Sequence, residues 1–143
     1  MKYLSCILFI FLIFNTNSAK ADNIEKKLDE LFNELKNNNV SSSYEIEQKI
    51  WKLWSTHPNN DKLTKMLAKG SDLVNEQKFD KAINVFNKVI ELDPNWAEAW
   101  NKRATLLYMV GEFKKSQEDI DKVLKLEQRH FGALAGQGLV NIK

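Results

Sequence analysis

The chain has 143 residues, with 21 lysine and arginine against 19 aspartate and glutamate side chains, so its formal net charge is +2. This near balance gives no electrostatic case for binding nucleic acid, which calls for a strongly basic surface. One cysteine and two histidines also exclude a disulfide framework and offer no ligand set for a zinc site.

The first 21 residues have the order of a secretory signal peptide. Lys2 supplies a positive start, residues 4–14 form an almost wholly apolar run, and Ala19-Lys20-Ala21 matches the small-x-small pattern that signal peptidase cuts. These eleven residues span about 16 Å as a helix, whereas a hydrocarbon core is about 30 Å thick. An uncleaved anchor is therefore the weaker alternative. We predict cleavage after Ala21, a periplasmic or secreted location, and membrane contact only before cleavage.

Cleavage at this point also changes the composition. It removes Lys2 and Lys20 but no acid, which leaves 19 basic against 19 acidic side chains. It removes Cys6, the single cysteine, as well. The mature chain is thus expected to be neutral, to bind no nucleic acid, and to be held together by its core in an oxidising compartment.

From residue 22 onward the apolar side chains follow helical spacing. Ile24, Leu28 and Leu31 fall on one helix face, as do Ile46 and Ile50 on the next helix. Two prolines and no long run of alternating polarity leave nothing that calls for a strand. The spacing predicts an all-α fold, with helices at 23–36, 43–56, 62–76, 79–91, 96–110, 113–126 and 130–141.

A period of 34 residues organises the later helices. The repeating positions are Met66, Trp100 and Leu134, then Gly70, Ala104 and Gly138, then Leu73 and Leu107, Phe79 and Phe113, Ala82 and Ser116, Phe86 and Ile120, and Val89 and Val123. Large residues match large ones and small residues match small ones. We therefore expect stacked hairpins in which Gly70 lies opposite Ala82, Ala104 lies opposite Ser116, and Trp100 fills the gap between neighbours.

This pattern resembles the tetratricopeptide repeat family. The first unit meets the family signature at Met66, Gly70, Leu73, Ala82, Phe86, Val89 and Pro94, and the second at Trp100, Ala104, Leu107, Gly111, Ser116, Ile120 and Val123. The second unit departs from the signature at Gln128, where the closing proline would lie, so its turn over 127–130 is less well defined. The resemblance implies a right-handed superhelical stack of antiparallel helix hairpins, an α-solenoid.

The repeat also divides the chain. We expect a cleaved signal peptide at 1–21 and a divergent N-terminal helical hairpin at 22–61, followed by repeat units at 63–96 and 97–130. Residues 131–143 then form a partial third unit or a C-terminal capping helix. Their apolar side chains, at Leu134, Leu139, Val140 and Ile142, leave little polarity for an outer face. We therefore expect either that this segment docks onto a partner or onto another copy, or that the chain is a shortened version of a longer array.

Catalytic chemistry has little support in the sequence. His57 and His130 are far apart and both stand at predicted turns, which gives neither a catalytic role. Gly132, Gly136 and Gly138 have no following Gly-Lys-Ser/Thr, so we expect close helix packing there and no phosphate loop. We predict that the chain is no enzyme and has no cofactor, metal or small-molecule substrate.

The charged residues of the second unit are expected to be solvated. This holds for Glu112, Glu118, Asp119 and Asp121, on helix starts and outer faces. Arg103 follows Trp96 and Trp100 in a stretch that looks like an aromatic–basic site, but it matches Lys69 in the preceding unit and is expected to be a tolerated charged position. Asn95 and Glu98 form a capping pair for the helix that follows. Most of this stretch is therefore interpreted as scaffold, with Asn101 and Lys102 facing a groove.

The family resemblance implies a concave groove lined by the first helix of each unit. The matching residues are Leu67, Ser71, Val74, Asn75, Asn101, Thr105, Tyr108, Met109, Ala135 and Leu139. Chaperone-binding members clamp a terminal carboxylate with groove lysines, an arginine and asparagines. The matching positions here carry Leu67, Ser71, Lys102, Gly132 and Gly136, so we do not expect that ligand. The mixed apolar lining suits a peptide or an amphipathic helix of another protein. The alternative is that Tyr108 and Met109 pack against a neighbouring helix.

The hypothesis that follows is a non-catalytic adaptor or scaffold in the bacterial envelope, which engages a segment of another protein in the groove. The alternative is a self-assembling envelope component that forms a homo-oligomer through residues 131–143. The sequence motivates the first by its signal peptide and two matched units, and the second by its apolar C-terminal helix.

Overall fold

The computed structural model describes residues 22–37 and 40–142. The predicted signal peptide, residues 1–21, lies outside this range. The chain divides into two compact units, one ending at Asp61 and the other beginning at Lys62, and each is described by itself. No helix within the described ranges is long and apolar enough to cross a membrane.

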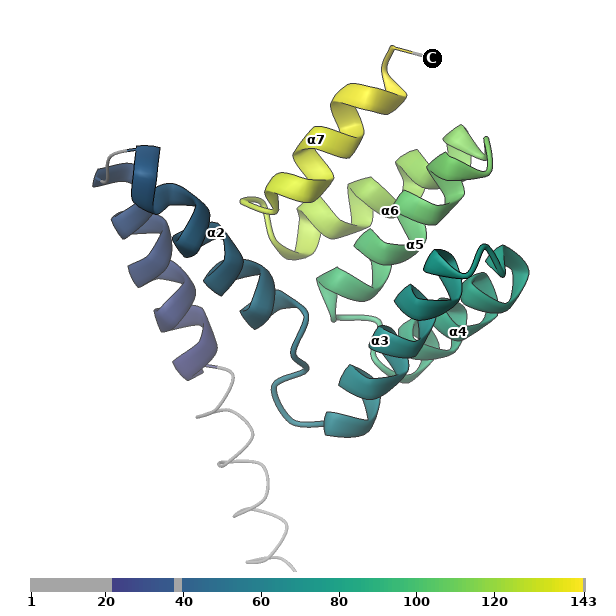
Figure 1. Ribbon diagram of the computed structural model, residues 1–143, viewed down its shortest axis with the longest axis horizontal. Coiled ribbons are helices and arrows are strands. Elements are labelled where there is room, and N and C mark those ends of the chain that lie inside the picture. The colour runs from purple at the N-terminus through teal and green to yellow at the C-terminus, as the bar shows by residue number, and fades with distance from the viewer. Residues whose placement is uncertain (1–21, 38–39, 143) are drawn as a thin grey trace, which may run out of the picture. The chain divides into compact units, whose positions relative to one another are not determined.

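All regular structure in the described residues is helical (Figure 1). Residues 22–37 form a helix that precedes α2. The labelled helices are α2 (Val40–Trp54), α3 (Asp61–Asn75), α4 (Phe79–Leu92), α5 (Ala97–Met109), α6 (Phe113–Leu126) and α7 (Phe131–Val140). The predicted helices agree with these bounds to within three residues at each end. The expected all-α helical-repeat fold is therefore confirmed.

The first unit is a helical hairpin with an aromatic contact between its helices. Leu28 of the first helix and Ile46 and Ile50 of α2 are buried. The rings of Phe32 and Trp54 lie 6.0 Å apart between centroids, at a tilt that favours an aromatic pair. The 3.6-residue spacing of these apolar side chains thus gives each helix one buried face.

In the second unit, the backbone hydrogen bonds repeat at the period that the side chains predict. The N–H of Lys78 donates to the carbonyl of Leu73, and the N–H of Glu112 donates to the carbonyl of Leu107, both at 2.9 Å. These donors and acceptors are each 34 residues apart. The turn inside each hairpin therefore has the same construction.

That turn needs one residue with left-handed backbone conformation. Gln77 has φ 58° and Gly111 has φ 83°, and the two residues are again 34 apart. Glycine adopts such angles without steric cost, whereas glutamine does not. The turn at Gly111 thus has the residue that fits, and the turn at Gln77 carries local strain.

The turns that close the two hairpins also match. Asp93 and Glu127 have φ −144° and −143°, with ψ 94° and 99°. In each, the carboxylate accepts the backbone N–H two residues later, from Asn95 to Asp93 Oδ1 and from Arg129 to Glu127 Oε1, both at 2.9 Å. Gln128 in place of the family's proline therefore leaves the turn unchanged.

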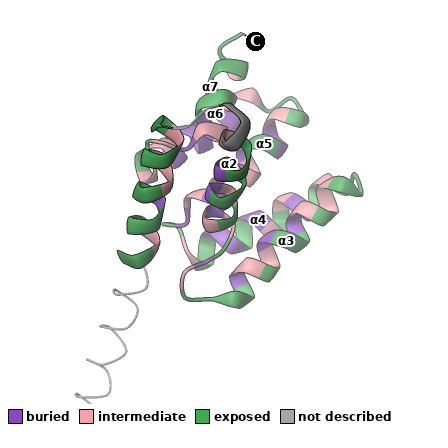
Figure 2. Cartoon of the chain, turned by 60° about the vertical axis from the view of Figure 1, so that its left-hand side comes forward, coloured by how far each residue is buried: buried purple, intermediate pink, exposed green. Residues whose placement is uncertain are grey.

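The core of the second unit consists of two clusters joined by Trp100. The first contains Leu63, Leu67, Ala82, Phe86, Val89, Ile90, Trp96, Ala99 and Leu106, and the second contains Ala104, Ile120, Val123 and Ala133. Trp100 packs against both clusters, and its indole Nε1 donates to the carbonyl of Pro94 at 2.9 Å. Its predicted place between neighbouring hairpins is confirmed. Buried and exposed positions occupy opposite sides of the helices (Figure 2).

Small residues allow close helix crossings, and one of the two predicted pairs is confirmed. Ser116 Oγ donates to the carbonyl of Ala104 at 2.9 Å, which confirms that pair. Gly70, however, meets Phe86, because a Cβ on Gly70 would lie 2.3 Å from the Phe86 ring. The nearest neighbour of Gly70 is thus the Phe86 ring, one helical turn after Ala82, and the expected pairing of Gly70 with Ala82 stays a prediction.

The glycines of α7 behave differently from one another. A Cβ on Gly136 would lie 3.3 Å from Ile120, as close packing predicts. A Cβ on Gly138 would meet no atom within 4 Å, so the prediction of close packing is wrong there. Leu134, on the same face, is 48% exposed. Within the described residues of the unit that begins at Lys62, no helix therefore packs against this face of α7.

Candidate functional site

Two small hollows are lined in part by α3, α5 and α7, the first helices of the repeat units, and Thr105 lines both of them. The α5–α7 hollow encloses about 200 Å³, and the α3–α5 hollow encloses about 180 Å³. The first is lined by Asn101, Ala104, Thr105, Tyr108, Ser116, Ile120, Gly132, Ala135, Gly136 and Leu139, and the second by Ser71, Val74, Asn75, Phe86, Lys102, Thr105, Leu106 and Met109.

These hollows bring together nine of the ten residues predicted to line a groove. The α5–α7 hollow is lined by Asn101, Thr105, Tyr108, Ala135 and Leu139. The α3–α5 hollow is lined by Thr105 together with Ser71, Val74, Asn75 and Met109. Leu67 is the exception, since it is 2% exposed and belongs to the core of α3, α4 and α5. Its assignment to the groove is wrong, because its side chain is buried in this core and leaves no surface for a partner.

Three polar side chains of the hollows use donors within the chain. The hydroxyls of Ser71 and Thr105 donate to the carbonyls of Leu67 and Asn101, at 3.3 and 2.9 Å. Asn101 Nδ2 donates to Glu98 Oε2 at 3.1 Å. What these positions offer a partner is therefore mainly apolar surface.

Tyr108 and Met109 have different surroundings. The Tyr108 ring lies 5.3 Å from the ring of Phe113 at the start of α6, so Tyr108 is half-buried against its own hairpin while it still lines the hollow. Met109 is 54% exposed. The alternative that Tyr108 and Met109 pack against a neighbouring helix thus holds for part of the Tyr108 side chain and does not account for Met109.

Beneath the α5–α7 hollow lies a buried polar network that the sequence did not predict. Glu98 and His130 have fully buried side chains, and Glu98 Oε2 lies 3.0 Å from His130 Nε2. Glu98 Oε1 pairs with Lys102 Nζ at 3.2 Å. The Ala133 N–H donates to His130 Nδ1 at 3.3 Å, so Nδ1 acts as an acceptor and Nε2 is the ring nitrogen that can donate to Glu98. His130 is therefore the residue that caps α7 and links it to α5.

This network corrects the predicted capping pair. α5 begins at Ala97, and its capping residue Trp96 makes no side-chain cap hydrogen bond. Glu98 turns inward to His130 and cannot reach back to Asn95 as a capping box requires. A histidine at a repeat boundary, 32 residues after an acid on the preceding first helix, is the signal that could have identified the pair.

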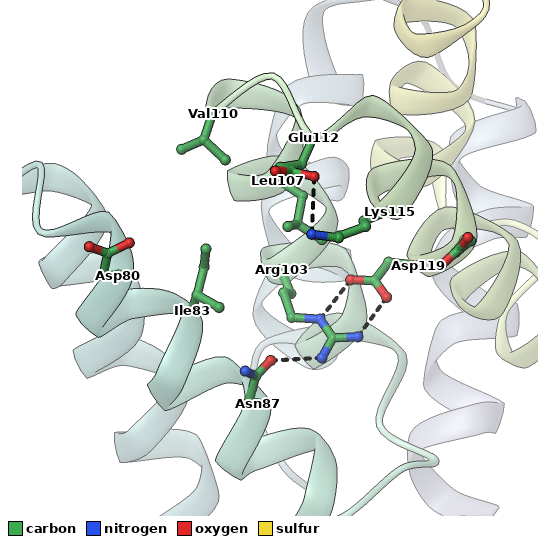
Figure 3. A pocket seen from close by; sticks show the side chains of 10 residues that line it. Asp80, Ile83, Asn87, Arg103, Leu107, Val110, Glu112, Lys115 and Asp119 are labelled. Carbon is green, nitrogen blue, oxygen red and sulfur yellow. Dashed lines mark hydrogen bonds and ion pairs between the residues drawn. The ribbon is translucent and has the colours of Figure 1, made fainter.

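Arg103 is likewise more than a tolerated charge. Its Nε and Nη2 each lie 2.7 Å from an oxygen of Asp119, and its Nη1 lies 2.7 Å from Asn87 Oδ1 (Figure 3). The guanidinium also stacks over Trp100, 5.0 Å from the ring centroid. Asp119 is buried, with 4% exposure. The expectation that Asp119 is solvated is wrong, because an antiparallel hairpin that pairs Ala104 with Ser116 brings the neighbouring positions 103 and 119 together.

A family model described as a TPR repeat, or tetratricopeptide repeat, matches residues 70–111, from within α3 to the turn after α5. The chain contains a tetratricopeptide repeat. Tetratricopeptide repeats generally mediate protein–protein interaction, and such solenoids present extended binding surfaces.

Several relatives share tetratricopeptide repeats or resemble part of the chain. A TPR repeat-containing protein of Rhizobium etli is 33% identical over 118 residues, which are 81% of this chain and 57% of that protein. The DnaJ protein P58IPK homolog B of Oryza sativa is 33% identical over 69 residues, 48% of this chain and 14% of that protein. A tetratricopeptide repeat protein 36 homolog of Nematostella vectensis is 37% identical over 59 residues, 41% of this chain and 32% of that protein. The chain thus spans only part of each relative.

The two hollows that meet at Thr105 contain no group of side chains that suggests a metal site. In the portion of the chain that the structure describes, no group of three or more histidine, cysteine, aspartate or glutamate side chains could hold a metal ion. The buried Glu98 and His130 engage each other, Lys102 and the backbone of α7. Their geometry is that of a link between helices.

Proposed function

We propose that this chain is a non-catalytic adaptor of the bacterial envelope that binds the apolar face of an amphipathic helix from another protein. The observation that carries the proposal is the pair of hollows that meet at Thr105. Three consecutive first helices, α3, α5 and α7, contribute to them. An amphipathic helix places apolar anchors at intervals of three and four residues, which suits two successive shallow hollows.

The lining supports a helix over an extended peptide with a free carboxylate. Ser71, Thr105 and Asn101 use their donors internally, and Lys102 pairs with Glu98. Apolar side chains are exposed beside Asn75 and Thr105, with Met109 54% and Leu139 50% exposed. Binding would therefore draw its free energy mainly from burial of apolar surface.

Site-specific photo-crosslinking in the native host can test the binding face. A photoreactive residue at Thr105 should trap a defined protein, and one at Asp121, an exposed position on α6, should not. The variant Met109→Glu should reduce the crosslink at Thr105, because it places a charge in the apolar lining. Equal crosslinking from both positions, or no effect of Met109→Glu in a folded variant, would contradict the proposal.

The envelope location needs its own experiment. The proposal rests on the apolar run at residues 4–14 and the Ala19-Lys20-Ala21 pattern. Cell fractionation should recover the chain outside the cytoplasm, and N-terminal sequencing should begin at Asp22. A cytoplasmic chain that starts at Met1 would contradict the location without affecting the binding face.

A second candidate function is self-assembly through α7. Leu134 and Leu139 of α7 are 48% and 50% exposed, and Ile142 just beyond it is 81% exposed. Two copies could bury these side chains against each other. Sedimentation equilibrium separates this candidate from the first, because it predicts a concentration-dependent dimer that Leu134→Glu abolishes. A strict monomer at high micromolar concentration excludes it.

A further inference from the structure

A larger hollow, of about 640 Å³, lies between α4 and α6 (Figure 3). We call it the outer hollow. Part of its lining comes from Arg103 and Leu107 of α5 and from Val110, the residue that caps the end of α5. At 100° per residue these three lie on the opposite face of α5 from Thr105 and Asn101. The outer hollow is therefore a separate surface from the two hollows that meet at Thr105.

The apolar part of the outer hollow's lining, which we call its apolar base, consists of Ile83 of α4, Leu107 of α5 and Val110 directly after α5. Leu107 is 7% exposed, and Val110 is 39% exposed. Figure 3 shows the Ile83, Leu107 and Val110 side chains between the two charged sides of the hollow. A ligand here would lay an aliphatic segment over these three residues.

The charges around this apolar base are unbalanced. Its lining contains four carboxylates and two basic side chains, namely Asp80, Glu112, Glu118, Asp119, Arg103 and Lys115. Both basic groups are already matched, since Arg103 holds both oxygens of Asp119 and Lys115 pairs with Glu112 at 3.1 Å. Asp80 on α4 and Glu118 on α6 therefore leave an excess of two negative charges.

We propose that the outer hollow binds a lysine or arginine side chain of a partner protein. The aliphatic stem of such a side chain matches Ile83, Leu107 and Val110, and its cationic end matches Asp80 and Glu118. An anionic ligand does not fit, because the guanidinium of Arg103 is bonded to Asp119 and Asn87. This surface adds to the proposed groove and does not depend on it.

A peptide titration tests the proposal. The probes are the capped peptide acetyl-Ala-Leu-Lys-Ala-Leu-Lys-Ala-amide and the same peptide with glutamine at both lysine positions. Each is titrated into the full chain, and backbone amide shifts are followed by NMR. The lysine peptide should shift the amides of Ile83, Leu107 and Val110, with less binding at high salt. The glutamine peptide should bind at least threefold more weakly.

Matched variants separate the hollow from overall charge. Asp80→Asn with Glu118→Gln should weaken the lysine peptide by about three- to tenfold, as expected for two partly solvated ion pairs. Asp72→Asn with Asp121→Asn removes two exposed charges outside the hollow and should change affinity less than twofold. Glu118→Gln alone leaves the first turn of α4 intact and should show part of the loss.

Four results would overturn the proposal. These are no binding of the lysine peptide at millimolar concentration, equal binding of the glutamine peptide, equal losses in the two double variants, or shifts confined to Thr105 and Tyr108. The last result would place the peptide in the groove. It would support the proposed function while rejecting the outer hollow, so the two proposals can fail separately.

Discussion

Arg103 and Asp119 form a two-pronged ion pair across the second hairpin, with both nitrogen–oxygen distances at 2.7 Å. The Arg103 side chain is 21% exposed and that of Asp119 is 5% exposed. Asn87 on α4 accepts the third guanidinium contact. One side chain of α5 thus connects α4 and α6, the helices on either side of the outer hollow.

Removal of this guanidinium should strongly destabilise the fold. Arg103→Ala leaves the buried Asp119 carboxylate without its counter-charge, so we expect a loss of about 3 kcal/mol in the free energy of unfolding, measured by urea denaturation. Arg103→Lys should recover only part of it, because an ammonium cannot make the forked contact. Replacement of both residues by apolar ones, Arg103→Met with Asp119→Leu, should cost less than Arg103→Ala. A loss below about 1 kcal/mol for Arg103→Ala would contradict this account.

The contact between Gly70 and Phe86 gives a second prediction. Gly70→Ala puts a methyl group where the Phe86 ring lies, 2.3 Å away, and should lower the free energy of unfolding by about 1–3 kcal/mol. The second repeat, residues 97–130, has alanine at position 104 and isoleucine at position 120, the matching sites. Gly70→Ala combined with Phe86→Ile should therefore cost less than the sum of the two single changes, by at least about 0.5 kcal/mol. Simple additivity would show that the ring is not the obstacle.

The two residues with left-handed backbone conformation, one in each repeat, predict opposite effects on stability. Gln77→Gly should stabilise the chain by about 0.5–1 kcal/mol, because it relieves strain at a φ of 58°. Gly111→Ala should destabilise it by about 1 kcal/mol. No atom lies within 4 Å of a Cβ at Gly111, so a steric clash cannot explain that loss. Thermal unfolding of both variants measures the effect, and changes of the same sign would contradict it.

Glu127 gives a pH dependence. Burial alone would raise the pKa of its carboxyl group, but hydrogen bonds from the Arg129 side chain and backbone, with the positive charge of Arg129, bring the pKa below its usual value of 4.5. Because the folded-state pKa is the lower one, this contribution to stability is present above about pH 4.5 and is lost as the pH falls through the folded-state pKa.

The variant Glu127→Gln isolates this contribution. It should be less stable than the wild-type chain at pH 7, and the difference should shrink below pH 4, as measured by urea denaturation at each pH. Glu118→Gln is the control for the loss of one carboxylate, because this side chain is exposed on α6. A constant difference between Glu127→Gln and wild type from pH 7 to pH 3 would contradict the assignment.

The sequence predicts most of this fold because the repeat is visible in the sizes of its side chains. Large and small side chains recur every 34 residues, and the helices, their turns and the position of Trp100 follow from that recurrence. The same reasoning places nine groove residues around two hollows, since first helices of stacked hairpins share one face. It fails for Leu67, because helix spacing alone cannot separate a position on the groove from one buried in the core.

Polar side chains were harder to place. Glu98, His130, Arg103 and Asp119 each look like surface residues when they are read along one helix. Their partners are 32 and 16 residues away, on helices whose relative rotation the period does not define. An aspartate such as Asp119 forms a buried ion pair only when the helix that carries its partner faces it at that position. The acidic excess of the outer hollow depends on the same tertiary pairing.

The turns at Asp93 and Glu127 share their backbone angles although only the first contains proline. A carboxylate that holds the amide two residues ahead sets the direction in which the chain leaves each hairpin. The pitch of the array is therefore controlled by a single side chain in each turn. An engineer who wished to lengthen this array, or to change its curvature, would alter that acid first and could leave the proline position free.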